Sequence, residues 1–253
     1  MGSEMCIRDR NTSHARIGPL EQDVYVNNDY ARSRGIEARL DKSLSNYWSF
    51  SLNYSYAFAY GKSSSDRSGY DAQFDQSAIP LRDMPLNWDQ RHLVNAIIDL
   101  RVKKDERPNV FNLFSLPDQW GLNFVMTWGS GFPYTPSKYN PNYTSKPGEK
   151  SWERTNAMRM PNQFNLDMKF NKNFSIGKMD YSFYFNVTNL TNYRSVLYVD
   201  GDTGEPDKSW VLWEDTDGDG LDDSYELMGD DYDKDPTKWS APTNIRLGIE
   251  MAW

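Results

Sequence analysis

The segment Tyr47–Tyr60, YWSFSLNYSYAFAY, carries the clearest structural signal in the chain. Every even-numbered residue from Trp48 to Tyr60 is aromatic or leucine, and every odd-numbered residue from Ser49 to Ala59 is small or polar. Successive side chains of a β-strand point to opposite faces. The segment is therefore predicted to be a strand with one large apolar face and one small polar face.

The same alternation recurs along the chain, which predicts an all-β fold. A weaker segment of this kind surrounds Val24, and in the segment that begins at His92 two residues, Leu93 and Ile97, depart from the pattern. No segment of similar length has the 3.6-residue period of a helix. Six further strands are predicted, at Gly35–Asp41, His92–Val102, Trp120–Trp128, Phe164–Phe170, Tyr181–Thr188 and Ile245–Trp253.

The composition excludes several other classes. The 253 residues include 9 Trp, 16 Tyr and 12 Phe, yet the mean hydropathy is −0.80 and no window is apolar enough for a membrane helix. A single cysteine excludes a disulfide scaffold. The net charge of −8 argues against a nucleic-acid partner, which would require a basic surface.

Alternation alone does not say which face meets water. A soluble β-sandwich buries the apolar face, whereas a transmembrane barrel turns it toward lipid. Several of the runs are about 9–14 residues long, nearer to the ~9–11 that cross a bilayer than to the ~5–6 of soluble strands. Tyr and Trp at the strand ends match an interfacial aromatic girdle.

The connections between predicted strands also favour a barrel. Shorter and longer ones alternate strictly, as in barrels with short periplasmic turns and long outer loops. A sandwich has no reason to obey this order. The shorter connections are Lys42–Asn46, Lys103–Asp118 and Asn171–Asp180, and the longer ones are Gly61–Gln90, Gly129–Gln163 and Asn189–Thr243.

Five phrases of the sequence resemble the C-terminal barrel portion of TonB-dependent outer-membrane receptors. They are YARSRGIEARL at Tyr30–Leu40, WDQRHL at Trp88–Leu93, GSGFPYT at Gly129–Thr135, FNVTNLTN at Phe185–Asn192 and the final strand Asn244–Trp253. Each is weak alone, but their order covers most of the chain.

The resemblance implies seven or eight antiparallel up-and-down strands of a 22-stranded barrel. The chain would then be a fragment without the plug domain that contacts TonB. The whole receptor would lie in the outer membrane of a Gram-negative-type bacterium, contact its lipid, and actively import a scarce nutrient such as a siderophore, cobalamin, glycan or peptide. An independent eight-stranded barrel or porin and a secreted calcium-binding adhesive sandwich remain the alternatives.

The two ends of the chain carry separate expectations. Residues 1–10, MGSEMCIRDR, have no strand or helix period and are interpreted as a cloning or assembly remnant, so that the barrel portion occupies residues 11–253. In the family that the chain resembles, a terminal aromatic residue is recognised by the barrel insertion machinery, and Trp253 matches it. The same residue would also serve as a girdle aromatic.

An acidic insert at residues 200–236 contains the sharpest local motif, DTDGDGLDDSYE. It matches the twelve-residue calcium loop, with Gly220 at the sharp turn. Asp222 replaces the usual aliphatic residue, and no helices flank the loop, which therefore resembles a thrombospondin type 3 or dockerin loop. The predicted Ca²⁺ ligands are Asp215, Asp217, Asp219, Leu221 through its carbonyl, Asp223 and Glu226.

No catalytic constellation is present, so an enzyme is not expected. The long outer loops of the family contact an extracellular small-molecule ligand, and aromatic and basic side chains there suit stacking or ion pairing. They equally suit packing between loops. The candidate substrate contacts are Arg82, Trp88, Tyr134, Tyr139, Trp152 and Arg154.

Overall fold

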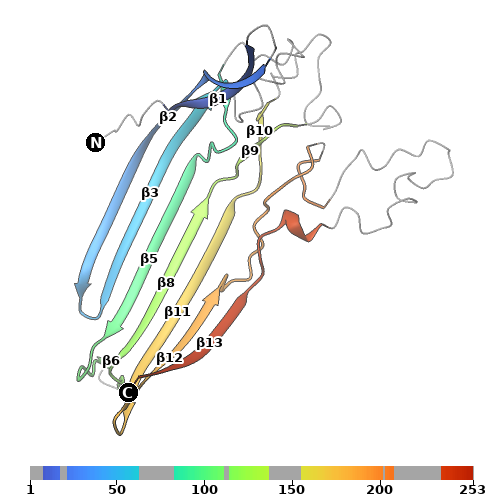
Figure 1. Cartoon of the computed structure of the whole chain (residues 1–253). Helices are drawn as coiled ribbons and strands as arrows, with labels where there is room; N and C mark the ends of the chain where they lie inside the picture. The colour runs from blue at the N-terminus through green and yellow to red at the C-terminus, as the bar shows by residue number, and fades with distance from the viewer. Residues whose placement is uncertain are drawn as a thin grey trace, which may run out of the picture.

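The computed structural model describes residues 8–17, 22–62, 83–110, 114–136, 155–201, 203–207 and 235–252, with the backbone alone at 8–17, 22–30, 110 and 114. These residues form one antiparallel sheet whose neighbours follow chain order (Figure 1). The strands are β1 (Arg8–Ile17), β2 (Gln22–Ser45), β3 (Trp48–Gly61), β5 (His92–Val102), β8 (Trp120–Gly129), β11 (Gln163–Ile176), β12 (Met179–Thr188) and β13 (Asn244–Ala252).

Short elements lie at the two ends of the sheet. Strand β4 (Met84–Pro85) pairs with β3, and the hairpin β6 (Asn109–Val110) with β7 (Phe114–Ser115) lies between β5 and β8. Strands β9 (Pro133–Tyr134) and β10 (Met158–Arg159) pair within the connection from β8 to β11. A 3-10 turn, η4 (Pro236–Lys238), precedes β13.

The all-β, antiparallel prediction is confirmed, and each of the seven predicted segments corresponds to one strand, except that Tyr47 belongs to a turn and Trp253 lies outside the described residues. The weaker segment near Val24 is not a strand of its own, because it is the first half of β2, which runs on through Gly35–Asp41. The polar run at Asn27–Asp29 stays extended since its backbone pairs with β1. The remaining long strand of the sheet is β1, whose sequence does not alternate and which was not predicted.

The apolar side chains lie in register across the sheet. From β3 to β13 the pairing contains no register shift among the described residues, so predicted apolar positions stand opposite one another on one face. We call this the apolar face. One of its rows is Phe50, Ile98, Phe124, Met168, Val187 and Ile245.

The opposite face is mostly polar, and its large aliphatic exceptions are Leu93, Ile97 and Val125. Ile97, which departs from the alternation, stands opposite Ser51 and Val125 on this face. One row across the polar face is Ser49, Asp99, Asn123, Lys169, Asn186 and Arg246. A one-residue slip in any strand would exchange the two faces, so the rows fix the register.

Tight turns close one end of the sheet, which we call the turn end. Asn46 and Tyr47 join β2 to β3 with φ of 51° and 71°, the two positive values of a type I′ hairpin turn. Lys42 braces this turn, since its Nζ donates to the carbonyl of Trp48 at 2.8 Å and lies 3.9 Å from the indole centroid. Gly177, with φ of 65°, turns β11 into β12.

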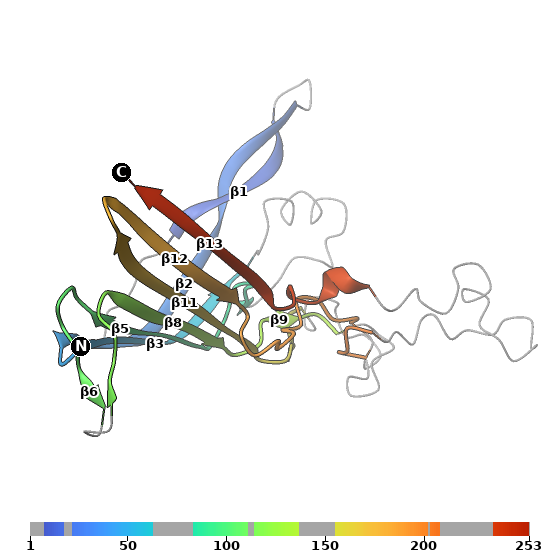
Figure 2. The ribbon, with the colours of Figure 1, turned by 90° about the horizontal axis from the view of Figure 1, so that it is seen from below.

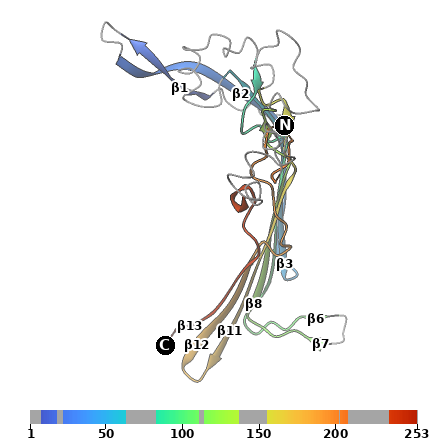
Figure 3. The same ribbon diagram turned by 90° about the vertical axis from the view of Figure 1, so that its right-hand side faces the viewer.

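The sheet is a single curved layer that is open along both sides (Figures 2 and 3). Its end strands are β1, which pairs only with the first half of β2, and β13. Much of the apolar face is uncovered: Leu40 is 60% exposed and Leu247 69% exposed. The described residues therefore bury almost no core, apart from a small cluster of Ala31, Ala59 and Leu86.

No helix among the described residues is long and apolar enough to cross a membrane.

Candidate functional site

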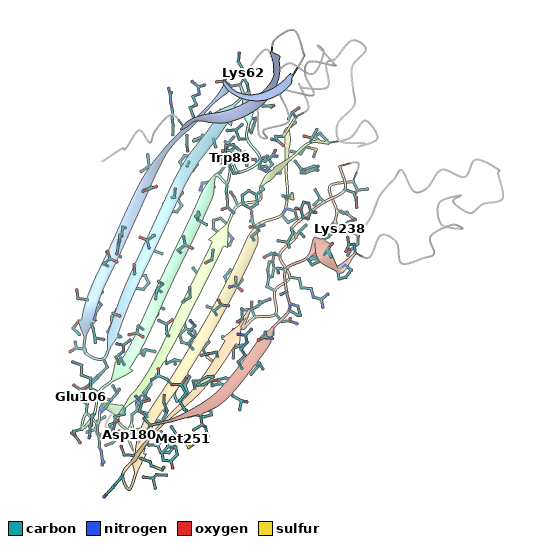
Figure 4. The ribbon with its side chains drawn as sticks, viewed as in Figure 1. Lys62, Trp88, Glu106, Asp180, Lys238 and Met251 are labelled. Carbon is teal, nitrogen blue, oxygen red and sulfur yellow. The ribbon has the colours of Figure 1, made fainter. Side chains whose placement is uncertain are left out.

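All three long connections leave the same end of the sheet, which we call the loop end. Strands β3, β8 and β12 finish there, and β5, β11 and β13 begin there, because consecutive strands alternate in direction. Trp88 and Lys238 lie toward this end, whereas Glu106, Asp180 and Met251 lie at the turn end (Figure 4). The loop end is thus where the candidate ligand-contacting segments gather.

A buried carboxylate organises the base of two long connections. The side chain of Asp89 is 0% exposed, and its Oδ1 accepts from the backbone N–H of Ala59 at 2.7 Å. Its Oδ2 accepts from Arg91 Nε at 2.9 Å and from the guanidinium of Arg159. Arg159 also donates to the carbonyl of Asp89, which ties β10 to the start of β5. We call these three residues the Asp89 cluster.

The cluster extends onto an aromatic platform. The guanidinium carbon of Arg91 lies 4.3 Å from the ring centroid of Phe58 and 5.7 Å from that of Tyr60, and Nη2 donates to the Tyr60 hydroxyl at 2.8 Å. Such stacking contributes on the order of 0.5–2 kcal/mol. Burial opposes the charge of Arg91, but its bonds to Asp89 leave the pKa raised overall. The single carboxylate of Asp89 is thus shared by two guanidinium groups, and the Asp89 cluster keeps one net positive charge.

Asn156 joins the same two connections at a second point. It is buried, and its Nδ2 donates to the carbonyl of Pro85 at 2.7 Å and to Asn87 Oδ1 at 2.8 Å. Its backbone N–H donates to Thr135 Oγ1 at 3.0 Å. A left-handed φ of 56° allows this arrangement. The connections after β3 and β8 are therefore packed together at their bases.

Two of the six predicted substrate contacts are described. Trp88 precedes Asp89 and is 47% exposed, so its ring is open to stacking. Tyr134 is half-buried, its hydroxyl is 3.5 Å from Met158 Sδ, and it lies against Gly204 in the last long connection. Tyr134 thus packs between loops. The other four, Arg82, Tyr139, Trp152 and Arg154, lie outside the described residues.

The base of the acidic insert is held in place by polar side chains. Asn189 is buried: its Nδ2 donates to the carbonyls of Tyr193 and Ala241, and its carbonyl accepts from Thr243 Oγ1 at 2.6 Å. Its backbone N–H donates to Asp167 Oδ1 at 2.9 Å. The two sides of the connection are thereby joined close to β12 and β13.

Further out, two bonds bring together the residues on either side of the insert. Lys238 Nζ donates to Asp200 Oδ2 at 2.9 Å, and the Trp239 indole N–H donates to Asp207 Oδ1 at 3.0 Å. Asp235 caps η4, and hydrogen bonds from the side chain and backbone of Thr237 hold the pKa of its carboxyl below the usual 3.8. The segment 208–234 thus begins and ends at a fixed base.

The predicted calcium ligands all fall in that segment, outside the described residues. Among the residues that the structure does describe, no three His, Cys, Asp or Glu side chains gather where they could hold a metal ion. Trp253 also lies outside them. The calcium loop and the role of the terminal tryptophan therefore stay predictions.

Sequence reasoning missed the Asp89 cluster. Asp89 and Arg91 fall in the phrase WDQRHL that marks the start of β5, but their partner Arg159 is 70 residues away. The sequence contains no local signal that joins them.

The chain matches no protein-family model and no curated protein. What the structure defines is the fold class: an open, antiparallel, single-layer β-sheet with three long connections at one end.

Proposed function

We propose that this chain is part of a transmembrane β-barrel of the outer membrane, with its apolar face toward lipid. The observation that supports this proposal is the apolar face itself. Its aromatic and aliphatic rows run across seven strands in register. They are half-buried on most of the central strands and exposed on the outer ones, with Ile36 at 60% and Ile249 at 61%. Soluble monomers rarely expose apolar patches beyond a few hundred Å². Lipid is the environment in which such a face is stable.

The ends of the sheet support the same proposal. Two tight turns and one short hairpin at one end, with long connections at the other, match the asymmetry of outer-membrane barrels. The part of β2 that follows Ala31 and the whole of β13 each have one unpaired edge among the described residues. Unpaired edges are not tolerated in hydrocarbon. Further strands joining these edges would complete a barrel, which favours a portion of a larger barrel over a closed eight-stranded one.

The transport activity rests on the resemblance to TonB-dependent receptors. We infer active uptake of a scarce nutrient, driven through TonB acting on a plug domain outside this chain, with Trp253 addressing the barrel insertion machinery. The open ring of Trp88 at the loop end is the described side chain best suited to contact an extracellular ligand. Arg82, Tyr139, Trp152 and Arg154 are proposed to join it.

We propose Ca²⁺ as a structural ion of the insert. Carboxylates on alternating residues from Asp215 to Asp219, followed by Glu226, are the oxygen ligands that this hard cation takes. The insert carries 15 acidic residues and two lysines between 200 and 236, a net charge of −13. A bound cation offsets that repulsion. The hydrogen bond between Trp239 and Asp207 joins the two sides of the insert, which supports a defined module rather than a random loop.

A secreted adhesive sandwich requires a second sheet packed on the apolar face. All seven alternating segments belong instead to one sheet, so the described residues provide no such layer. The sandwich is therefore the weaker candidate.

Detergent dependence tests the barrel proposal. The chain should enter detergent micelles and precipitate when detergent is removed, and in cells it should fractionate with outer membranes. A chain that stays soluble and monomeric without detergent would contradict the proposal. Recovery of the upstream gene sequence tests the receptor class, because a plug domain separates a TonB-dependent receptor from a porin.

A further inference from the structure

The connection between β5 and β8 is unusual for the turn end, because it forms a hairpin rather than a tight turn. Strands β6 and β7 project away from the layer of the sheet near that end (Figure 3). Leu116 N donates to the carbonyl of Pro108 at 3.0 Å, and Asp105 N donates to Asp118 Oδ2 at 3.0 Å. The hairpin therefore has a fixed base.

Two grooves flank the hairpin where it meets the apolar face. The first, of about 540 Å³, is walled by Phe170, Phe174 and Phe183. The second, of about 480 Å³, is walled by Leu100, Val102 and Arg107. Leu116 of the hairpin and Trp120 of β8 line both. Volumes of ~300–1,000 Å³ are those of small-molecule sites.

Each groove has one cation among its lining residues. Lys172 stands in an otherwise apolar row between Trp120 and Phe183, and its ammonium bonds to the carbonyl of Asp118 and lies 3.6 Å from that residue's carboxylate. Arg107 at the second groove is exposed and has no ion-pair partner among the described residues. The first cation is neutralised, whereas the second is free to meet an anion.

Trp120 gives a further indication that the site lacks a component. Its indole Nε1 is buried and has no hydrogen-bond partner among the described residues. A buried donor without an acceptor costs about 1–3 kcal/mol. The indole lies beside both grooves, so the unpaired donor borders the same two apolar surfaces.

We propose that the β6–β7 hairpin and the apolar face bind one anionic phospholipid of the leaflet at the turn end. An acyl chain occupies the apolar grooves that Leu116 lines, and the phosphate pairs with the guanidinium of Arg107. Apolar walls with a free cation at the rim complement an amphiphile of this charge. The inference rests on the proposed membrane location, and it adds a specific lipid site to a face otherwise in non-specific contact with lipid.

Native mass spectrometry of the whole chain in a nonionic detergent tests the site, with phosphatidylglycerol and phosphatidylcholine as probes. Phosphatidylglycerol should be retained in preference to phosphatidylcholine. Arg107→Gln should weaken phosphatidylglycerol binding about fivefold, the effect expected of one cation beside anionic lipid, and leave phosphatidylcholine unchanged. Leu116→Asn should weaken the binding of both.

Lys178→Gln is the matched control, because Lys178 is also an exposed cation at the turn end but lines neither groove. Equal binding by the Arg107 and Lys178 variants, no preference between the lipids, or a chain dimer in place of lipid adducts would overturn the inference. Precipitation without detergent combined with no lipid preference refutes this site alone. Solubility without detergent refutes the membrane proposal, whatever the adducts show.

Discussion

Removal of the Asp89 carboxylate should open the base of the loop end. Asp89→Ala leaves two guanidinium groups, at Arg91 and Arg159, without their shared anion, and it leaves the Ala59 N–H without an acceptor. Removing one partner of a buried ion pair costs about 3–5 kcal/mol. Because the arginine side chains keep 28% and 31% exposure, water compensates in part, and we expect about 3 kcal/mol.

Amide hydrogen exchange measures this opening locally. The Ala59 N–H bonds to Asp89, and the Leu86 N–H bonds to the Ala59 carbonyl at 2.9 Å, so both amides report on the cluster. A loss of about 3 kcal/mol speeds their exchange about 150-fold when it is limited by local opening. Asp89→Asn keeps an acceptor for Ala59 and should give a smaller effect, about 2 kcal/mol.

Asp99→Asn provides the matched control. Asp99 pairs with Arg101 at 3.2 Å, but these side chains are 20% and 58% exposed, and such pairs contribute about 0–1 kcal/mol. If Asp89→Ala accelerates exchange at Ala59 and Leu86 no more than Asp99→Asn does, the cluster does not hold the loop end together.

Three further predictions concern other parts of the chain. A side chain at Gly248 would overlap the ring of Tyr184, so Gly248→Val should destabilise the β12–β13 pair by about 1–3 kcal/mol in denaturant unfolding, and adding Tyr184→Ala should restore part of it. Asp217→Ala should abolish the heat of calcium binding in titration calorimetry, whereas absence of heat from the unaltered chain at millimolar calcium would rule out the loop. A hydrogen bond from the Asp105 N–H, aided by Lys172, lowers the pKa of Asp118 below 3.8. Its contribution to stability is therefore complete above pH 3.8 and disappears as the pH falls through the lowered folded value. The protection of the Asp105 amide, measured relative to its intrinsic exchange rate, should therefore fall below about pH 4, and Asp118→Asn should remove that dependence.

The strands and their faces could be predicted because a single period-2 pattern encodes both. Trp128, for example, was assigned to the apolar side of its strand, and it stands between Val94 and Phe164 on the apolar face. The alternation did not reveal β1, since RDRNTSHARI pairs with β2 through its backbone and leaves no side-chain pattern. The alternation also did not show that the segment near Val24 and the segment Gly35–Asp41 form one continuous strand, because polar residues lie between them.

The loop end could be predicted only in outline. Connection lengths located it, but its stabilising contacts join residues far apart in the chain, such as Asp89 with Arg159 and Asn156 with Pro85. No spacing rule anticipates these pairs. Tyr134 was a candidate ligand contact because it is aromatic and lies in a long connection. Its half-buried position against Gly204 suits packing between loops, the alternative that the sequence had left open.

The apolar face limits what the surroundings of this sheet can be. A half-buried antiparallel sheet in water needs a second layer, built from helices or from more alternating strands. Every alternating segment of the chain is already used in the one sheet, and apolar side chains fill most positions of its apolar face from β2, as at Ile36, to β13, as at Met251. The described residues cover only a small part of this face, such as the buried Val187. Whatever covers this face must therefore come from outside these strands. Lys42 stacks on a tryptophan at the turn end and Arg91 stacks on a phenylalanine at the loop end. This arrangement suits a cover that is apolar in the middle and meets water at both margins. A bilayer has that profile, whereas a second protein layer would have no need of charged residues at both margins.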